Sequence, residues 1–246
     1  MKTEDFDYSL PVEYIAQMPA EPRDHSRLLV LDRKSGEITH DHFYRIGEYL
    51  KSGDLLVINR TRVIPARLFG NKLPGQGRVE VLLLRKEDET SWECLVGGKG
   101  LKVGVKIQIE HGPLAEIAAV LEGSKSLVRF TAPIEAYFTA AGHVPLPPYI
   151  HNLDVDPERY QTVFNKVLGS AAAPTAGLHF TRDLMESLNQ KDIHFAMITL
   201  HVGLDTFAPV TEANPQAHKI HQEWCELTEG TAEMINRTRA AGGRIV

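Results

Sequence analysis

The sequence predicts an α/β domain, built from a mixed sheet with helices, into which an antiparallel all-β barrel domain is inserted. Residues 55–58 form a continuous apolar run, as in a strand that is buried on both faces, and residues 193–202 have the pattern of a long strand. Helical patterns flank both. Between them, short strand patterns recur about every 10–15 residues and are separated by turns, which is typical of a small barrel. We expect residues 1–62 and 150–246 to form the α/β domain, and residues 63–149 to form the barrel.

The first part of the α/β domain is predicted to contain a short helix, a hairpin, a second helix and a buried strand. In chain order these elements cover residues 12–17, 28–31 with 37–40, 43–50 and 55–58. The barrel strands are expected at residues 78–84, 91–96, 105–109, 114–121 and 127–130. A helical pattern follows at 134–141, and the prolines after Val144 then require an extended chain.

The last part of the chain is predicted to alternate between helix and strand. Its elements cover residues 182–190, 193–202 and 228–241, with Thr181 and Thr228 as helix caps. Residues 244–246 have the pattern of a strand that has only begun. We therefore expect a longer parent protein to continue after Val246, the alternative being a disordered apolar end.

Composition excludes several classes of protein. The 246 residues include 27 basic and 32 acidic side chains, for a net charge of −5, so a nucleic-acid partner must be held by a local patch. The two cysteines, Cys94 and Cys225, cannot form a disulfide framework and match no zinc pattern. Neither a secretion signal nor an apolar run of membrane-spanning length is present. We expect a cytoplasmic protein that does not bind membranes.

Three stretches contain basic residues and no acidic ones: residues 55–79, 94–109 and 159–182. Such stretches suit contact with a polyanion, because neutralising phosphates releases counterions. For Lys99, Lys102 and Lys106 we favour the alternative of solvated strand edges. For Arg60 and Arg62 we favour function, since they follow a buried strand and would point toward a crevice.

Several further features could form a site. The small residues from Gly169 to Gly177 lead into a helix start, where a backbone can approach an anion closely; tight packing is the alternative. His201 ends the long strand, where a polar side chain suits a site, although a packed core histidine is the commoner case. His218 and His221 would share one helix face, and with His201 they could hold the metal of a hydrolase.

Six strings of residues occur in one order along the chain. They are GDLLVINRTRVIPARLFG from Gly53, HVPLPPYI from His143, RYQTVF from Arg159, GSAAAPTAGLHFT from Gly169, TLHVGLDTF from Thr199 and HKIHQEWCEL from His218. Together they closely resemble the S-adenosylmethionine:tRNA ribosyltransferase-isomerase family of queuosine biosynthesis. The resemblance extends from Asp5 to the last residue.

The resemblance implies a specific reaction. The ribosyl part of S-adenosylmethionine is transferred to the aminomethyl group of a 7-deazaguanine base at the tRNA wobble position. The ribose is rearranged to an epoxycyclopentane, which gives epoxyqueuosine-tRNA and releases adenine and methionine. The resemblance also implies a monomer with an inserted barrel. Since the sulfonium is its own electron sink, neither a metal nor a separate cofactor is expected.

This chemistry needs a base for a carbon beside the sulfonium and assistance for the departing adenine. His179 and His201 are the candidates, because imidazole can be tuned near neutral pH, and Glu223 is a third. The candidates for binding S-adenosylmethionine and tRNA are Asn59, Thr61, Arg62, Arg67, Arg159, Tyr160, Gln161, Thr175, Ala176, Gly177 and Gly203.

The sequence departs from the family at several positions. Arg60 stands where the family more usually has Asp, so an acidic partner for the substrate amine or ribose is missing or supplied elsewhere. Asp205 and Ala208 replace a Gly and an Arg, an exchange of charge that could compensate. Two other functions remain open: a metal-dependent hydrolase that uses His201, His218 and His221, and a non-catalytic RNA-binding module.

Overall fold

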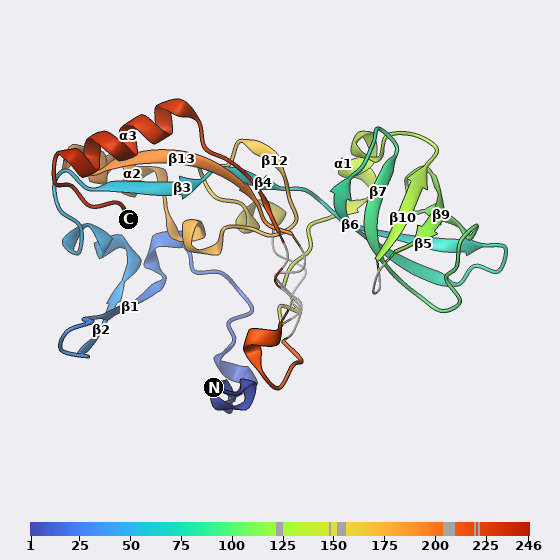
Figure 1. Ribbon diagram of the computed structural model, residues 1–246, viewed down its shortest axis with the longest axis horizontal. Coiled ribbons are helices and arrows are strands. Elements are labelled where there is room, and N and C mark those ends of the chain that lie inside the picture. The colour runs from blue at the N-terminus through green and yellow to red at the C-terminus, as the bar shows by residue number, and fades with distance from the viewer. Residues whose placement is uncertain (122–124, 148, 152–155, 204–209, 219, 221) are drawn as a thin grey trace. The chain divides into compact units, whose positions relative to one another are not determined.

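The computed structural model describes every residue except 122–124, 148, 152–155, 204–209, 219 and 221. The chain forms two compact units, one of Met1–Arg62 with Pro147–Val246 and the other of Val63–Leu146. The first contains a mixed sheet with helices and the second a closed antiparallel barrel (Figure 1). The predicted fold class is therefore confirmed.

A three-stranded sheet lies at the centre of the first unit. Strand β3 (Leu55–Asn59) runs parallel to β13 (His194–His201), and β13 pairs antiparallel with β14 (Trp224–Glu226) on its other side. Leu55 and Ile58 are buried, as the unbroken apolar run predicts. Pairing in parallel brings the carboxyl ends of β3 and β13 to one edge of the sheet.

Two capped helices accompany this sheet (Figure 1). Helix α2 (Arg182–Gln190) begins at Thr181, whose Oγ1 accepts a hydrogen bond from the Leu184 amide at 3.2 Å. Helix α3 (Glu229–Ala240) begins at Thr228, whose Oγ1 accepts from the Thr231 amide at 3.3 Å. Both predicted caps are confirmed.

Residues 244–246 extend the pairing of β3. The amide of Leu55 donates to the carbonyl of Arg244 at 2.9 Å, and that of Val57 donates to Val246 at 2.8 Å. The Arg244 guanidinium also contacts the carboxylate of Asp54, with Nε 2.9 Å from Oδ1. This hydrogen bond lowers the pKa of the buried Asp54 to about 2.

The rest of the first unit consists of short elements. The predicted hairpin forms from β1 (Arg27–Leu31) and β2 (Ile38–His42), and β4 (Thr61–Val63) pairs with β12 (Val167–Ser170). The 3-10 helices in the described part of this unit are Thr3–Phe6, Val12–Tyr14, Arg23–His25, Phe43–Glu48, Pro157–Tyr160, Thr175–His179 and Pro215–Ala217. The α-helices predicted at 12–17 and 43–50 are thus 3-10 turns, because their aromatic, β-branched and glycine residues are poor α-helix formers.

The second unit is the barrel. Its strands are β5 (Arg67–Leu73), β6 (Arg78–Lys86), β7 (Ser91–Gly97), β8 (Lys106–Ile109), β9 (Leu114–Val120) and β10 (Lys125–Phe130). Pairing follows the order β5–β6–β7–β10–β9–β8, and β5 with β8 closes the ring. The 3-10 helix Ile134–Tyr137, α1 (Phe138–Ala141) and β11 (Gly142–His143) follow. Over the described residues of both units, no helix has the length and apolar character to cross a membrane.

Candidate active site

Four of the predicted site residues lie where β3 and β13 end: Asn59, Thr61, His201 and Gly203. The Asn59 amide ties the two strand ends together. Its Oδ1 accepts from the backbone amides of Thr61 and Leu200, both at 3.0 Å, and its Nδ2 donates to the Leu200 carbonyl at 2.8 Å. The chain therefore brings these residues into one region, which we call the strand-end site.

His201 is held from several sides in the strand-end site. Its Nδ1 lies 2.7 Å from the hydroxyl of Thr61, which is almost fully buried. The indole of Trp224, its partner across the β13–β14 pair, stacks on the imidazole with 5.0 Å between ring centroids and 20° between planes. These contacts fix both the position and the tilt of the ring.

Gly169 of β12 approaches the same imidazole. A Cβ built on it would lie 2.5 Å from Nε2, 2.7 Å from Cε1 and 2.8 Å from Cδ2 of His201. Such similar distances place this Cβ over the ring and not beyond Nε2 in the ring plane. Gly169 therefore does not block the in-plane direction along which Nε2 would form a hydrogen bond. Among the described residues, Nε2 has no hydrogen-bond partner.

Burial favours the neutral form of His201. Burial lowers its pKa, and the carboxylate of Glu226 acts weakly in the opposite direction. Glu226 is itself paired with Arg60, whose Nη2 lies 3.2 Å from its Oε2, while Arg60 Nε donates to Thr199 at 3.0 Å. Glu226 of β14 is therefore the acidic partner of Arg60 itself.

Glu223 and the small-residue run also reach the strand-end site. The half-buried Glu223 accepts a hydrogen bond from the Gly203 amide through Oε1 at 3.1 Å. The fully buried hydroxyl of Ser170 accepts from the Val202 amide at 2.9 Å and donates to the Ala172 carbonyl at 2.7 Å. Val202 and Gly203 are therefore each held by a side chain from another segment.

His179 lies in a second group, beside the 3-10 helix Arg23–His25. Its Nδ1 is 2.9 Å from the hydroxyl of Ser26, and that hydroxyl donates to the Arg23 carbonyl at 2.6 Å. Since a hydroxyl has a single proton, Nδ1 must be the donor to Ser26, and Nε2 of the neutral ring carries the lone pair. Burial lowers the pKa of His179, so the ring is neutral near pH 7.

Arg23 connects His179 to the segment that contains other predicted residues. Its guanidinium donates to the carbonyls of Gln161, at 2.5 Å, and Glu158, at 2.9 Å. The buried Gln161 is thereby anchored through its backbone. Tyr160 forms a hydrogen bond with the backbone of Ala173, and burial raises the pKa of its phenol.

Arg62 and Arg159 both have acidic partners within the first unit. Arg62 forms an ion pair with Glu158 and donates to Asn165 Oδ1 at 2.7 Å. Arg159 pairs with Glu21 at 3.1 Å and donates to a backbone carbonyl of the N-terminal segment. Their charges are therefore partly neutralised before any ligand binds.

The expected amide site at the helix start is only partly available. Thr175 and Ala176 are exposed at the start of the 3-10 helix Thr175–His179. The Gly177 amide donates to the Pro174 carbonyl at 2.8 Å, and a Cβ on Gly177 would lie 2.8 Å from Phe164. Tight packing is therefore the role of Gly177, and its amide cannot hold a ligand.

The remaining candidates lie elsewhere. Arg67 belongs to the barrel, where its Nε lies 2.9 Å from the carboxylate of Glu80. His218 follows the 3-10 helix Pro215–Ala217 and has its Nδ1 2.9 Å from Glu212. His221, Asp205 and Ala208 lie outside the described residues. Within the part of the chain that is described, no three His, Cys, Asp or Glu side chains are grouped for a metal ion.

Sequence patterns do not identify Ser26, Trp224 and Glu226, and they do not indicate that Gly169 contacts His201. Gly169 and Trp224 lie within the matched strings, which is the signal that could have found them. Ser26 and Glu226 gain their roles only from neighbours distant in the chain, Ser26 from His179 and Glu226 from Arg60.

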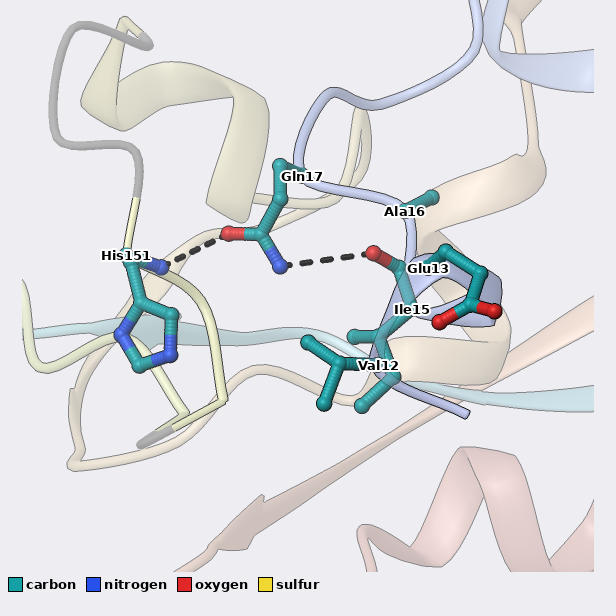
Figure 2. A pocket seen from close by; sticks show the side chains of 6 residues that line it. All are labelled: Val12, Glu13, Ile15, Ala16, Gln17 and His151. Atoms are coloured by element: carbon teal, nitrogen blue, oxygen red, sulfur yellow. Dashed lines mark hydrogen bonds between the residues drawn. The ribbon is translucent and has the colours of Figure 1, made fainter. Parts of the chain in front are cut away.

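A separate hollow of about 810 Å³ lies in the first unit, between residues 12–17 and His151 (Figure 2). Gln17 bridges its rim, since Oε1 accepts from the His151 amide at 2.8 Å and Nε2 donates toward the Ile15 carbonyl at 3.4 Å. None of the predicted site residues lines it.

Comparison with known proteins adds a direct finding. The family model described as "Queuosine biosynthesis protein" matches residues 3–246. Proteins named S-adenosylmethionine:tRNA ribosyltransferase-isomerase from Dehalococcoides mccartyi strain CBDB1 and Carboxydothermus hydrogenoformans are each 49% identical over 100% of this chain and 73% of their own length. A crystal structure of S-adenosylmethionine tRNA ribosyltransferase from Thermotoga maritima shows 34% identity over 98% of this chain and 68% of that one, with a TM-score of 0.44.

Proposed function

Because this chain belongs to the queuosine biosynthesis protein family, we propose that it carries out the complete ribosyl transfer and isomerisation on tRNA. The chain is a transferase and isomerase of queuosine biosynthesis, an S-adenosylmethionine:tRNA ribosyltransferase-isomerase like the relatives it matches. The observation that carries the assignment is the match of one family model to nearly the whole chain. The hydrolase and the non-catalytic module have no such support.

The acceptor in this proposal is the aminomethyl group of a 7-deazaguanine base at the tRNA wobble position. S-adenosylmethionine donates the ribosyl group, and adenine and methionine leave. We propose that the enzyme acts as a monomer in the cytoplasm and needs neither a metal nor a further cofactor. Sedimentation of the protein alone and with tRNA tests the monomer. Metal analysis after dialysis tests whether a metal is needed.

His179 is the general base in this proposal. The hydrogen bond to Ser26 fixes its tautomer and leaves the Nε2 lone pair available. The lowered pKa keeps that nitrogen unprotonated near neutral pH. Both properties suit removal of the acidic proton beside the sulfonium.

His201 assists the departing adenine. The Thr61 hydroxyl lies 3.5 Å from the Val167 carbonyl oxygen but only 2.7 Å from His201 Nδ1. The hydroxyl therefore donates its proton to Nδ1. Nε2 then carries the hydrogen and donates in the ring plane toward a purine nitrogen. The Glu223 carboxylate, which accepts the Gly203 amide through Oε1, borders the same site and is the third acid/base candidate.

The test is adenine release in single turnover, with tRNA that carries the 7-deazaguanine precursor. His179→Gln and His201→Gln should each lower the rate by about 10²–10⁴-fold, the usual contribution of a positioned acid or base. His194→Gln is the matched control, since His194 is exposed at the other end of β13. No adenine release by the wild-type protein would refute the function, and full activity in both variants would refute the roles.

A further inference from the structure

The barrel brings two acid-free parts of the sequence together at one end. The β5–β6 turn, residues 72–78, and the β7–β8 loop, residues 98–106, contain Lys72, Arg78, Lys99, Lys102 and Lys106, and no acidic residue. Strand β5 pairs with β6 on one side and with β8 on the other, so the end of β5 adjoins both segments. We call these two segments the basic loop pair.

Direct contacts confirm that the two segments touch. Lys72 Nζ donates to the Lys99 carbonyl at 2.5 Å, and a Cβ on Gly100 would lie 3.7 Å from the same nitrogen. A Cβ on Gly98 would lie 3.3 Å from the Arg78 carbonyl. The cations of the basic loop pair therefore share one surface, although up to 34 residues separate them in sequence.

The charges of this surface are not cancelled locally. Among the described residues, none of the five cations forms an ion pair, whereas Arg85 and Lys86 at the opposite end of the barrel pair with Glu87 and Glu135. Glu80, near the basic loop pair, is paired with Arg67. Lys106 faces Glu116 across the β8–β9 register, so we leave it out of the binding set.

The side chains are also presented for contact. Arg78, Lys99 and Lys102 are exposed, and the Arg78 guanidinium is held over the Phe69 ring at 5.1 Å from its centroid. Gly75, Gly77, Gly98 and Gly100 leave the backbone of both loops without bulky side chains. A phosphate backbone can approach such a surface closely.

We propose that the basic loop pair is a docking surface for the sugar-phosphate backbone of the tRNA substrate. This inference rests on the proposed function, and it assigns to Arg78, Lys99 and Lys102 a role as phosphate contacts that are independent of sequence. Solvated strand edges are the alternative for the lysines. The gathering of both acid-free segments on one surface, which the sequence does not show, favours docking.

The experiment measures the salt dependence of tRNA binding by the full chain carrying Lys99→Gln with Lys102→Gln. Each phosphate contact contributes about 0.7–0.9 to the slope of log affinity against log salt, so the slope should fall by about 1.4–1.8 in the double variant. The matched control is Arg85→Gln with Lys86→Gln, which removes two charges from the opposite end and should leave the slope unchanged.

Adenine release at saturating tRNA separates this inference from the proposed function. We expect the Lys99→Gln, Lys102→Gln variant to keep the wild-type rate, since neither side chain belongs to the catalytic site. An unchanged slope with normal adenine release would overturn the docking surface and leave the function intact. Equal losses of slope in the variant and its control would also overturn it, because the effect would then come from net charge.

Discussion

Substitution of Gly169 tests the packing of the strand-end site. In Gly169→Ala the new Cβ would lie 2.5 Å from His201 Nε2, so the imidazole or β12 must move, which costs about 1–3 kcal/mol. Gly169 also has a φ of +150°, a conformation that costs another side chain about 1–3 kcal/mol. We therefore expect the free energy of unfolding to fall by about 2–6 kcal/mol.

Gly98 separates the two contributions, because its φ is also +150°. A Cβ there would lie 3.3 Å or more from its neighbours, so Gly98→Ala carries the backbone strain with little collision. Urea unfolding should show Gly169→Ala to be less stable than Gly98→Ala by about 1–3 kcal/mol. Only Gly169→Ala should slow adenine release at saturating tRNA. Equal stabilities together with normal release in both variants would refute the contact between Gly169 and His201.

Two other substitutions test the hydrogen bonds around the central sheet. Thr61→Val removes the hydrogen-bond partner of His201 Nδ1. We expect kcat to fall about 10-fold or more with KM unchanged. Nitrogen NMR should show a changed tautomer of His201, and a wild-type tautomer in this variant would contradict the assignment. Asp54→Asn removes a carboxylate whose pKa is lowered from 3.8 to about 2 by Arg244. The pKa difference corresponds to at most about 2.4 kcal/mol, and since Arg244 is 46% exposed we expect a loss of about 1–2 kcal/mol. This stabilisation is present above pH 3.8 and disappears as the pH falls through the folded pKa, so the variant and wild-type urea midpoints should converge between pH 4 and pH 2; a constant gap would contradict the linkage.

The parts of the fold that could be predicted are those in which local pattern and burial agree. Residues 55–58 become part of β3 because a strand covered on both faces needs apolar side chains, and Leu55, Leu56 and Ile58 are buried there. Helix α2 occupies the predicted residues because Thr181 fixes its start. Strand β5 escapes prediction since Arg67, Gly70 and Asn71 interrupt its pattern. Its stability comes from pairing with β6 and β8, which are distant in sequence.

The candidate site likewise has a part that the sequence predicts and a part that it does not. The position of His201 at a strand end follows from the sequence, but its surroundings do not, because Thr61, Gly169 and Trp224 reach it from three other segments. The run of small residues predicts a close backbone approach without saying to what. In the structure, the closest approach at Gly169 is to the imidazole of His201 itself.

The imidazoles of His179 and His201 are each anchored by a hydroxyl group and not by a carboxylate. The choice of anchoring group affects the charge of the ring. A carboxylate within about 4–6 Å would raise the pKa of an imidazole by about 1–3 units, whereas Ser26 and Thr61 fix the rings without adding charge. Burial then lowers the pKa of both rings. In the proposed function, both neutral imidazoles then act on a substrate that already carries a positive sulfonium.

Ser26→Asp tests this argument at His179. The new carboxylate should raise the pKa of the ring, so that the loss of activity on acidification begins at a higher pH by about 1–3 units. In the wild-type protein the base is neutral and active down to its lowered pKa, and activity falls as the pH drops through that value. The pH dependence of adenine release measures the shift, with Ser26→Asn as the uncharged control of the same size. If the acid limb stays in place or moves to lower pH in Ser26→Asp, His179 is not the base whose protonation limits the reaction.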